Sequence, residues 1–485
     1  GNLIVCVPMV PLFALATARD LFPEKPRRVA RTLVAFVAAA AAFVFYVETR
    51  RRLFPAAVPP AFTAAANEGR SASHRAFAAL MRWYGQPVLP RDLLNNPLAA
   101  TDAPHRIAGA LRVYWRGLVQ VVFPKTLSGD YSSPQEPVPA TLVFPESVLG
   151  ALCMVLPLPV AAALALRSYR AGKAKPAEAA KPAADSPYRE PAEPAPAAAV
   201  ASLEVAPDQV DYRPLVAVSL VWVVASYFPV SNIPIVLPTV RAERFWYFPV
   251  VGTSILLAIA AVRAFERARA VDAAAPGAGV WETVRQKTGL RRAHAIGLFV
   301  AAFTLFQSVA ARLHANDYTT DLTFWDATRK AVPRSAKAHL NYSVMKGARG
   351  DLEARRAANV IALELAPEWP MASIYLGDTL CRMHRAPEAW PHYKKGFEMA
   401  QNDVNLLSLG LQCLWDEKLI TPPKAEAGEP TPPESPTRAE LRAIAARHPG
   451  SWLEWLTNDI VANGETHKGV DPKHRPRGYN EGPKE

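Results

Sequence analysis

The chain has 485 residues, a formal net charge of +12 and 50% hydrophobic residues, and this length is enough for two or three domains. Its lysines and arginines lie in small groups beside apolar segments instead of in one long run, which excludes a basic nucleic-acid-binding arm. The same distribution favours a membrane protein that faces anionic lipid. An apolar part over residues 1–313 precedes a more polar remainder.

The apolar part contains six stretches of the length that a helix needs to cross a bilayer, about 20 mostly apolar residues. They run over residues 2–18, 32–49, 145–166, 214–230, 246–264 and 293–311. The stretch 107–123 is different, because Arg112 and Arg116 lie four residues apart and share one helix face. It is therefore amphipathic, and we expect an interfacial or partly buried helix instead of a lipid-facing span.

The distribution of basic residues predicts the orientation of these spans. Three basic loops alternate correctly with six spans and are predicted to be cytoplasmic, namely 19–31, 167–213 and 263–292. The other side then receives loop 50–144, the loop around Arg241 and everything after the sixth span. One conflict remains, because Arg50, Arg51 and Arg52 fall on that outer side. Residues 171–210 are mostly Ala and Pro and predict a flexible cytoplasmic linker.

Between two of the spans, the chain carries Arg241, Glu243 and Arg244. Charge this close to a bilayer is costly unless it lies at the interface or in a polar cavity. Two interpretations are about equally open. A fixed Arg–Glu–Arg cluster can hold an anionic headgroup such as a lipid phosphate, or the arginines only snorkel and anchor the end of a helix.

Residues 318–410 carry a 34-residue period, shown by pairs such as Pro333 and Pro367 or Asn359 and Tyr393. This period predicts tetratricopeptide-type helical hairpins over 336–367 and 370–401, a half-unit that ends at Pro333, and a degenerate unit near 404–418. Such hairpins stack because each leaves an apolar face that only its neighbour covers. The alternative is an ordinary helical bundle in which the spacing arises by chance.

The tail after Ile420 is rich in Pro, Glu and Ala. One amphipathic helix is predicted at 436–447, with Ser435 as its N-cap and Leu441 and Ile444 on one face. The stretch 452–455, with a tryptophan at each end, is suited to dock on the last repeat, and disorder is expected from about 464. We therefore predict an all-α chain with a polytopic membrane domain over 1–313, a tetratricopeptide-repeat α-solenoid over 314–420 and a Pro-rich, largely disordered tail with one short helix over 421–485.

The four cysteines are Cys6, Cys153, Cys381 and Cys413. None forms a CxxC pair, so neither a zinc ribbon nor a redox motif is indicated. The histidines are scattered without an HExxH pattern, and no metal site is predicted. Cys381 and Cys413 are able to meet across helices, but free buried thiols are the expectation.

Four landmarks in this order resemble a known family. They are Asn95-Asn-Pro-Leu98, Phe123-Pro-Lys-Thr-Leu-Ser-Gly-Asp-Tyr-Ser132, Ala242-Glu-Arg-Phe-Trp-Tyr-Phe-Pro249, and a last span that runs directly into helical repeats. Over roughly residues 1–410 the chain resembles the transmembrane and tetratricopeptide-repeat-containing O-mannosyltransferases and their bacterial relatives, within the GT-C glycosyltransferase superfamily. It departs from the first motif, because Asn95 stands where the family has an aspartate.

The resemblance implies an enzyme that takes a sugar, mannose in this family, from a polyprenyl-phosphate donor and transfers it to protein hydroxyls on the non-cytoplasmic face. Arg241 and Arg244 are the candidates for the donor phosphate, because guanidinium groups bind phosphate in a bidentate manner, and Glu243 is suited to orient one of them. Asp130 either shapes the site or caps a turn, and the turn is favoured. Asn96 is a second candidate for shaping the site.

The lipid-linked sugar is the one ligand that the resemblance implies; no cofactor is assigned, and dependence on a divalent metal is left open. The expected partners are the lipid bilayer and an acceptor protein or peptide held by the repeats, with no nucleic acid. In this superfamily the catalytic acidic residue lies in the first outer loop, so we expect it upstream of Gly1. The alternative is a non-catalytic, membrane-anchored repeat scaffold for envelope protein complexes. Richness in Ala, Arg and Pro suggests a bacterial inner membrane with periplasmic repeats, or the ER membrane with lumenal repeats if the chain is eukaryotic.

Overall fold

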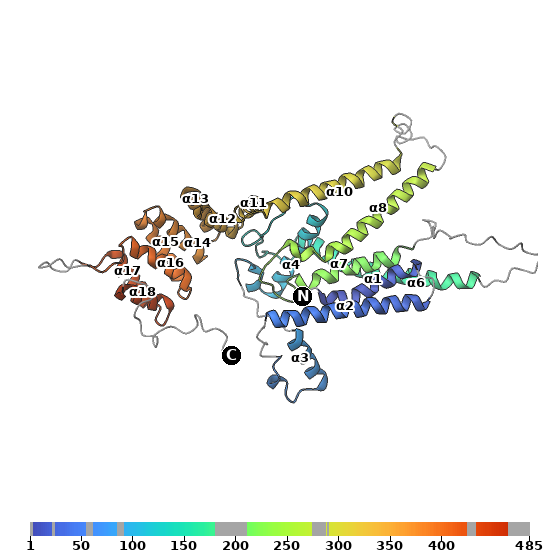
Figure 1. Cartoon of the computed structure of the whole chain (residues 1–485), viewed down its shortest axis with the longest axis horizontal. Coiled ribbons are helices and arrows are strands. Elements are labelled where there is room, and N and C mark those ends of the chain that lie inside the picture. Colours follow the sequence, from blue (N-terminus) through green and yellow to red (C-terminus); the bar gives the residue numbers. More distant parts are fainter. Residues whose placement is uncertain are drawn as a thin grey trace, which may run out of the picture.

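The computed structural model describes residues 3–21, 25–54, 62–84, 92–179, 211–273, 288, 291–423 and 433–463. Within these ranges every regular element is a helix and there is no strand, which confirms the all-α prediction. Figure 1 shows a bundle of long helices followed by a group of short helices. The two parts join where α10 (Arg292–Asp317) meets α11 (Asp321–Ala331).

Five stretches are long and apolar enough to cross a membrane, which is consistent with an integral membrane protein: Pro26–Leu53, Pro145–Ala171, Arg213–Val230, Pro249–Asp272 and Arg292–Asp317. They are built by α2 (Lys25–Leu53), α5 (Pro145–Val155) with α6 (Pro157–Ala179), α7 (Arg213–Tyr227), α8 (Pro249–Ala273) and α10. The first predicted span, 2–18, differs from these. It lies in α1 (Leu3–Leu21), whose apolar part Ile4–Thr17 is shorter, so the described residues hold five such stretches and not six.

The long helices alternate in direction. In Figure 1 the C-terminal ends of α1, α6 and α8 lie at one end of the bundle, and those of α2, α7 and α10 lie at the other. The basic loops 19–31, 167–213 and 263–292 contain the C-terminal ends of α1, α6 and α8, so this alternation agrees with the prediction that all three lie on one side. Helix α6 runs to Ala179, inside the predicted linker, while the rest of that linker, 180–210, lies outside the described residues.

The amphipathic segment predicted at 107–123 forms α4 (Ala103–Val122), which is partly buried in the bundle. Its Pro104 lies in the first turn, where a missing N–H costs nothing. Gly117 allows close packing, because a Cβ there would lie 2.0 Å from the indole nitrogen of Trp246. The rings of Tyr114 and Trp246 stack with centroids 5.4 Å apart, and Arg112 is only 5% exposed. Helix α4 thus lies inside the protein instead of facing lipid along its length.

The short helices recur at a constant interval. They are α12 (Ala336–Gly347), α13 (Leu352–Leu365), α14 (Pro370–Arg382), α15 (Ala386–Met399) and α16 (Val404–Asp416). Helices α12, α14 and α16 begin 34 residues apart, as do α13 and α15. Small residues at the contacts, Ala362 and Ala389, are fully buried, and Tyr393 and Phe397 fill the core. The period seen in the sequence is therefore the period of the helices.

The tail contains two helices, where we expected only one. Helix α17 (Pro436–Ala446) begins as predicted, because the Ser435 hydroxyl accepts a hydrogen bond from the Arg438 amide at 3.2 Å, and Leu441 and Ile444 are buried. Helix α18 (Trp452–Asn463) follows it, and the Leu453 amide donates to the Gln401 carbonyl at 2.9 Å. The tryptophan-containing stretch thus packs on the turn before α16 and on the core that α16 shares. Residues 464–485, for which we expected disorder, lie outside the described ranges.

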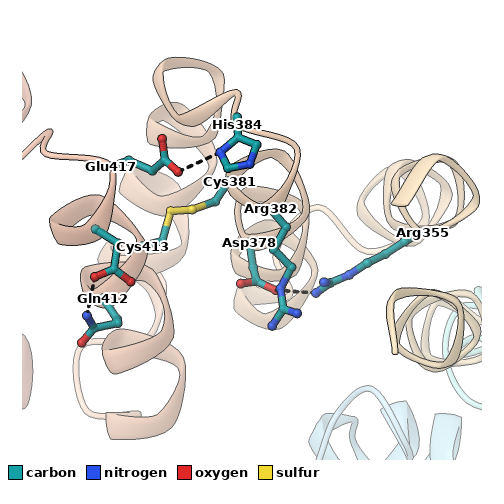
Figure 2. Close-up of a disulfide and its surroundings, with 9 residues drawn as sticks. Arg355, Asp378, Cys381, Arg382, His384, Gln412, Cys413 and Glu417 are labelled. Carbon is teal, nitrogen blue, oxygen red and sulfur yellow. Dashed lines mark hydrogen bonds and ion pairs between the residues drawn. A yellow bond between two sulfur atoms is a disulfide. The ribbon is translucent and has the colours of Figure 1, made fainter. Parts of the chain in front are cut away.

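Cys381 and Cys413 form a disulfide, so the expectation of two free thiols was wrong. Figure 2 shows the bond between α14 and α16, beside the ion pair of Arg355 with Asp378. The Cα atoms of the two cysteines are 6.3 Å apart, within the usual range for a disulfide. Cys6 and Cys153 are free thiols in the long-helix bundle.

Candidate functional site

A group of five charged side chains lies where α4, the loop after it, the first turn of α5 and the loop before α8 meet. We call it the arginine cluster, and it comprises Arg112, Arg116, Arg241, Glu136 and Glu146. Its centre is Glu136, which is 1% exposed. One carboxylate oxygen of Glu136 lies 2.8 Å from Arg241 Nη1, and the other lies 2.7 Å from Arg116 Nη1 and 3.4 Å from Arg112 Nε. Three guanidinium groups therefore surround one buried carboxylate.

The cluster contains three arginines and two glutamates, Glu136 and Glu146, so it carries one excess positive charge. Glu146 and Arg116 form a two-point contact, with both N–O distances at 2.9 Å. Arg112 also donates to the Pro137 carbonyl. Burial lowers the pKa of the Arg112 guanidinium, and the negative charge of Glu136 opposes that change. The two carboxylates thus offset the charge of three guanidinium groups at a largely buried position.

Arg241, a predicted phosphate ligand, is occupied by contacts inside the protein. Besides its ion pair with Glu136, its Nη2 donates to the Gln120 Oε1 atom at 2.8 Å. The face of its guanidinium lies 4.2 Å from the centroid of the Tyr131 ring, a cation–π contact. Its side chain is 13% exposed. Arg241 therefore fixes the loop before α8 against α4.

Glu243 is held in the same way, from three directions. Its Oε1 atom accepts hydrogen bonds from the Ser128 amide at 2.6 Å, the Tyr131 hydroxyl at 2.9 Å and Gln120 Nε2 at 3.0 Å. Its Oε2 atom lies 3.1 Å from His314 Nε2, near the end of α10. Glu243 therefore joins three segments, and it does not contact either neighbouring arginine in the way that the sequence suggested.

Arg244 differs from both, because its side chain is exposed. It lies on the short 3-10 helix η6 (Glu243–Trp246), directly before the membrane stretch that begins at Pro249. Its guanidinium carbon lies 5.4 Å from the Phe245 ring centroid, and among the described side chains no carboxylate forms an ion pair with it. Burial raises the pKa of the nearby Tyr318 hydroxyl and Glu243 adds to this rise, while Arg244 opposes it. Arg244 is the predicted residue that remains accessible to an anion.

Asp130 joins the long-helix bundle to the short helices. Its Oδ2 atom accepts a hydrogen bond from the Ser132 amide at 3.1 Å, which closes a turn, and another from the Ser335 hydroxyl at 3.0 Å. Ser335 is the N-cap of α12, and Lys337 Nζ lies 3.5 Å from the other oxygen of Asp130. Asp130 therefore closes a turn, the role that we favoured from the sequence, and it also holds the start of α12.

Asn96 is fully buried and shapes the loops beside the cluster. Its amide nitrogen donates to Asn232 Oδ1 at 2.9 Å and to the Leu237 carbonyl at 2.6 Å, while its oxygen accepts from the Leu98 amide at 3.1 Å. The side-chain oxygen of the neighbouring Asn95 accepts from Lys337 at 2.8 Å. This motif therefore connects two loops and α12, and its hydrogen bonds do not involve Arg244.

Replacing Asp130 by alanine is expected to loosen the junction between the bundle and the short helices. The substitution removes the carboxylate that accepts from the Ser132 amide, the Ser132 hydroxyl and the Ser335 hydroxyl, and leaves the two hydroxyls only each other as acceptors, at a cost of about 1–3 kcal/mol. Limited proteolysis between α10 and α12 measures this directly, and the variant should be cut faster than the unmodified protein. Asp416→Ala, at the exposed end of α16, is the control and should leave the rate unchanged. Equal rates for the two variants would contradict the role given to Asp130.

Three residues of this region were not predicted from the sequence: Glu136, Gln120 and His314. Glu136 is in a Pro-rich loop, 105 residues before Arg241, and no periodic pattern connects the two. His314 was passed over as one of several scattered histidines, although its position at the end of the last apolar span is a usable signal. Its Nδ1 atom lies 3.0 Å from Asp317, so it stands between two carboxylates.

Two surface hollows lie elsewhere, in the C-terminal helices. One, of about 360 Å³, is between α17 and α18, and the other, of about 500 Å³, is at the turn before α16. Neither is lined by a residue of the arginine cluster or by Arg244. In the described parts of the chain, no group of three His, Cys, Asp or Glu side chains is arranged to hold a metal ion. No family model, curated protein or solved structure matches the chain.

Proposed function

We propose that the chain is a membrane glycosyltransferase of the GT-C type, which uses a polyprenyl-phosphate sugar and modifies protein hydroxyls on the non-cytoplasmic face. The observation that carries this proposal is Arg244, an exposed guanidinium on a turn at the start of a membrane stretch. A lipid-linked phosphate places its charge at that depth, with its chain in the bilayer. An arginine there stabilises the phosphate as it leaves the sugar.

In this proposal Arg241 and Glu243 act by holding the turn in place. Both are saturated by internal contacts, so they fix the backbone of η6 while Arg244 contacts the donor. The carboxylates of Glu136 and Glu243 are each held by three or more donor groups, so neither is placed to accept a proton from an acceptor hydroxyl. The base for the acceptor is therefore not assigned to either of them.

The short helices serve as the acceptor-binding part, and we assign them to the tetratricopeptide class on the strength of their 34-residue interval. The Cys381–Cys413 disulfide supports their location in an oxidising compartment, such as the bacterial periplasm or the ER lumen. Two contacts support a donor and an acceptor site on one side: Asp130 accepts a hydrogen bond from Ser335 at the start of α12, and Arg244 is close enough to Tyr318, after α10, to influence its pKa.

Arg244→Ala is expected to weaken binding of the donor phosphate. A charge-assisted hydrogen bond contributes about 1.5–3 kcal/mol, so the Kd for undecaprenyl phosphate should rise about 10- to 150-fold. The measurement is titration of undecaprenyl phosphate into the detergent-purified protein, followed by intrinsic tryptophan fluorescence. Arg244→Lys keeps the charge but loses the two-point contact, and an intermediate Kd is expected.

Arg267→Ala is the matched control, because Arg267 is an exposed arginine near the other end of α8. Its Kd should equal that of the unmodified protein. Sugar transfer from a polyprenyl-phosphate sugar, assayed in vesicles that contain the protein, should fall in Arg244→Ala and stay constant in Arg267→Ala. Equal binding and equal transfer for both variants would remove Arg244 from the proposal.

A membrane-anchored scaffold is the second candidate function, and the contacts of Arg241 and Glu243 favour it. Two of the three predicted donor ligands are structural, as a scaffold requires. A scaffold binds no polyprenyl phosphate, so the titration also separates the two candidates. Binding that is absent in the unmodified protein would favour the scaffold.

A further inference from the structure

Helix α3 (Ala72–Tyr84) is attached beside the end of the membrane stretch Pro26–Leu53, as Figure 1 shows. The Trp83 indole donates to Glu48 at 2.7 Å, and Arg50 donates to the carbonyl of Tyr84. The Phe43 ring contacts those of Trp83 and Tyr84, with centroids 5.8 and 6.0 Å away. These contacts fix the C-terminal end of α3 at the level where α2 leaves the apolar layer.

One side of α3 is apolar and largely uncovered, although the ring of Phe77 contacts that of Phe62 with centroids 6.3 Å apart. Phe77 and Leu80, three residues apart and thus on one face, are 52% and 51% exposed. Leu53 and Phe54, where α2 ends, are 66% and 71% exposed. Only Ala78 of α3 is buried. Large apolar side chains are thus left uncovered on both sides of the joint between α2 and α3.

The membrane stretch of α2, to which α3 is attached, also exposes large apolar side chains. Phe45, on the membrane stretch of α2, is 73% exposed, and Val37 is 56% exposed. A helix of this stretch has its apolar side chains covered by acyl chains when it spans a bilayer. Tryptophan and tyrosine are typical of the interface between acyl chains and headgroups, and Trp83 and Tyr84 lie where α3 joins α2.

The charges at the joint fit the same surroundings. Arg51 and Arg52 are exposed next to Leu53, and Arg75 lies on the side of α3 opposite to Phe77. Basic residues at the headgroup level attract anionic lipids. Of the three consecutive arginines, Arg50 fastens α3, Arg51 lies 3.4 Å from Glu48 in an exposed ion pair, and Arg52 is exposed, so the last two remain accessible to headgroups.

We propose that α3 is an interfacial helix that lies on the non-cytoplasmic leaflet, with Phe77 and Leu80 in the acyl-chain boundary and Arg51 and Arg52 among anionic headgroups. The occupant of the uncovered face is therefore the bilayer that surrounds α2. The inference rests on the membrane stretch of α2 and is independent of the proposed sugar transfer.

Spin labels on the two faces of α3 test the proposal in vesicles that hold the whole protein. The free thiols are first removed by Cys6→Ala and Cys153→Ala, with the Cys381–Cys413 disulfide retained. A label at Leu80→Cys should collide more often with oxygen, which dissolves in the acyl region, than with a water-soluble nickel chelate. A label at Arg75→Cys, on the opposite face, should show the reverse.

The composition of the vesicles separates the role of the arginines. Adding anionic phosphatidylglycerol to phosphatidylcholine should slow the motion of the label at position 80, and Arg51→Gln with Arg52→Gln should abolish that difference. A label at position 80 that meets the nickel chelate as often as the one at position 75 would place α3 in water. A label shielded from both reagents would place the face against protein. Either result overturns the proposal.

Discussion

Glu136→Ala is expected to lower the free energy of unfolding by roughly 3–5 kcal/mol, because it leaves uncompensated charge inside the protein. The carboxylate is 1% exposed and is the shared partner of Arg112, Arg116 and Arg241. Without it, two of these arginines lose their only ion-pair partner among the described side chains, while Arg116 keeps Glu146. The measurement is the midpoint of SDS-induced unfolding in mixed micelles, followed by tryptophan fluorescence.

Glu146→Ala is the matched control, because this acid is 36% exposed and serves a single arginine. Ion pairs near the surface contribute about 0–1 kcal/mol, so its unfolding midpoint should move much less. Glu136→Gln separates charge from shape, since glutamine keeps one acceptor oxygen but cannot neutralise a guanidinium group; it should be nearly as unstable as the alanine variant. Equal shifts for the variants at 136 and 146 would show that the cluster is not buried as described.

The Glu136 contacts explain why the candidate site was only partly predictable. The motif around Arg241 was visible in the sequence, because two arginines and a glutamate between apolar stretches are costly unless they lie at the membrane interface or in a polar site. The sequence does not show which arginine is satisfied internally, because the partner is 105 residues away and a Pro-rich loop has no period that sets its direction. Arg244 and Arg241 are three residues apart and chemically equal. Their exposed fractions differ because Glu136 and Gln120 face only Arg241.

The helices were predictable to different degrees for a physical reason. Apolar stretches of membrane length are set by composition alone, so α2, α7, α8 and α10 are found where hydropathy predicts them. The stretch 2–18 qualified by the same rule, yet the apolar part of α1 in the structure is shorter. The 34-residue interval of the short helices was also visible in the sequence. Each helix packs on its neighbour in the same way, and these repeated contacts require small side chains such as Ala362 and Ala389. Helix α18 was not predicted, since its stability comes from packing on α16.

The disulfide was the clearest failure of sequence reasoning, although a signal for it exists. Cys381 and Cys413 are 32 residues apart, close to the 34-residue interval between the starts of α14 and α16. Residues separated by one repeat occupy similar places on stacked helices, so two cysteines at nearly this separation are brought together by the repeat itself. Their Cα atoms are 6.3 Å apart as a result. The period thus predicts the proximity, and the compartment decides whether a bond forms.

Removing this disulfide by Cys381→Ser with Cys413→Ser is expected to destabilise the short helices by about 3–4 kcal/mol, because the closed loop restricts the freedom of the unfolded chain. The loop spans 32 residues and ties α14 to α16, within the core that α17 and α18 also join. Protease resistance of the region after α11, measured against temperature, should fall in this variant. It should fall equally when the unmodified protein is treated with a membrane-impermeant reductant in sealed vesicles of known orientation.

The free thiols supply the control, because Cys6→Ala with Cys153→Ala lies in the other part of the chain and should leave this resistance unchanged. The two treatments carry separate information. Because Cys381 and Cys413 are only 9% and 7% exposed, the reductant is also applied to vesicles opened with detergent. If it acts on opened vesicles but not on sealed vesicles whose non-cytoplasmic face is outward, the disulfide lies on the other side and the assigned compartment is wrong. If neither treatment changes the resistance, packing around Tyr393 and Phe397 holds α14 and α16 together without the bond.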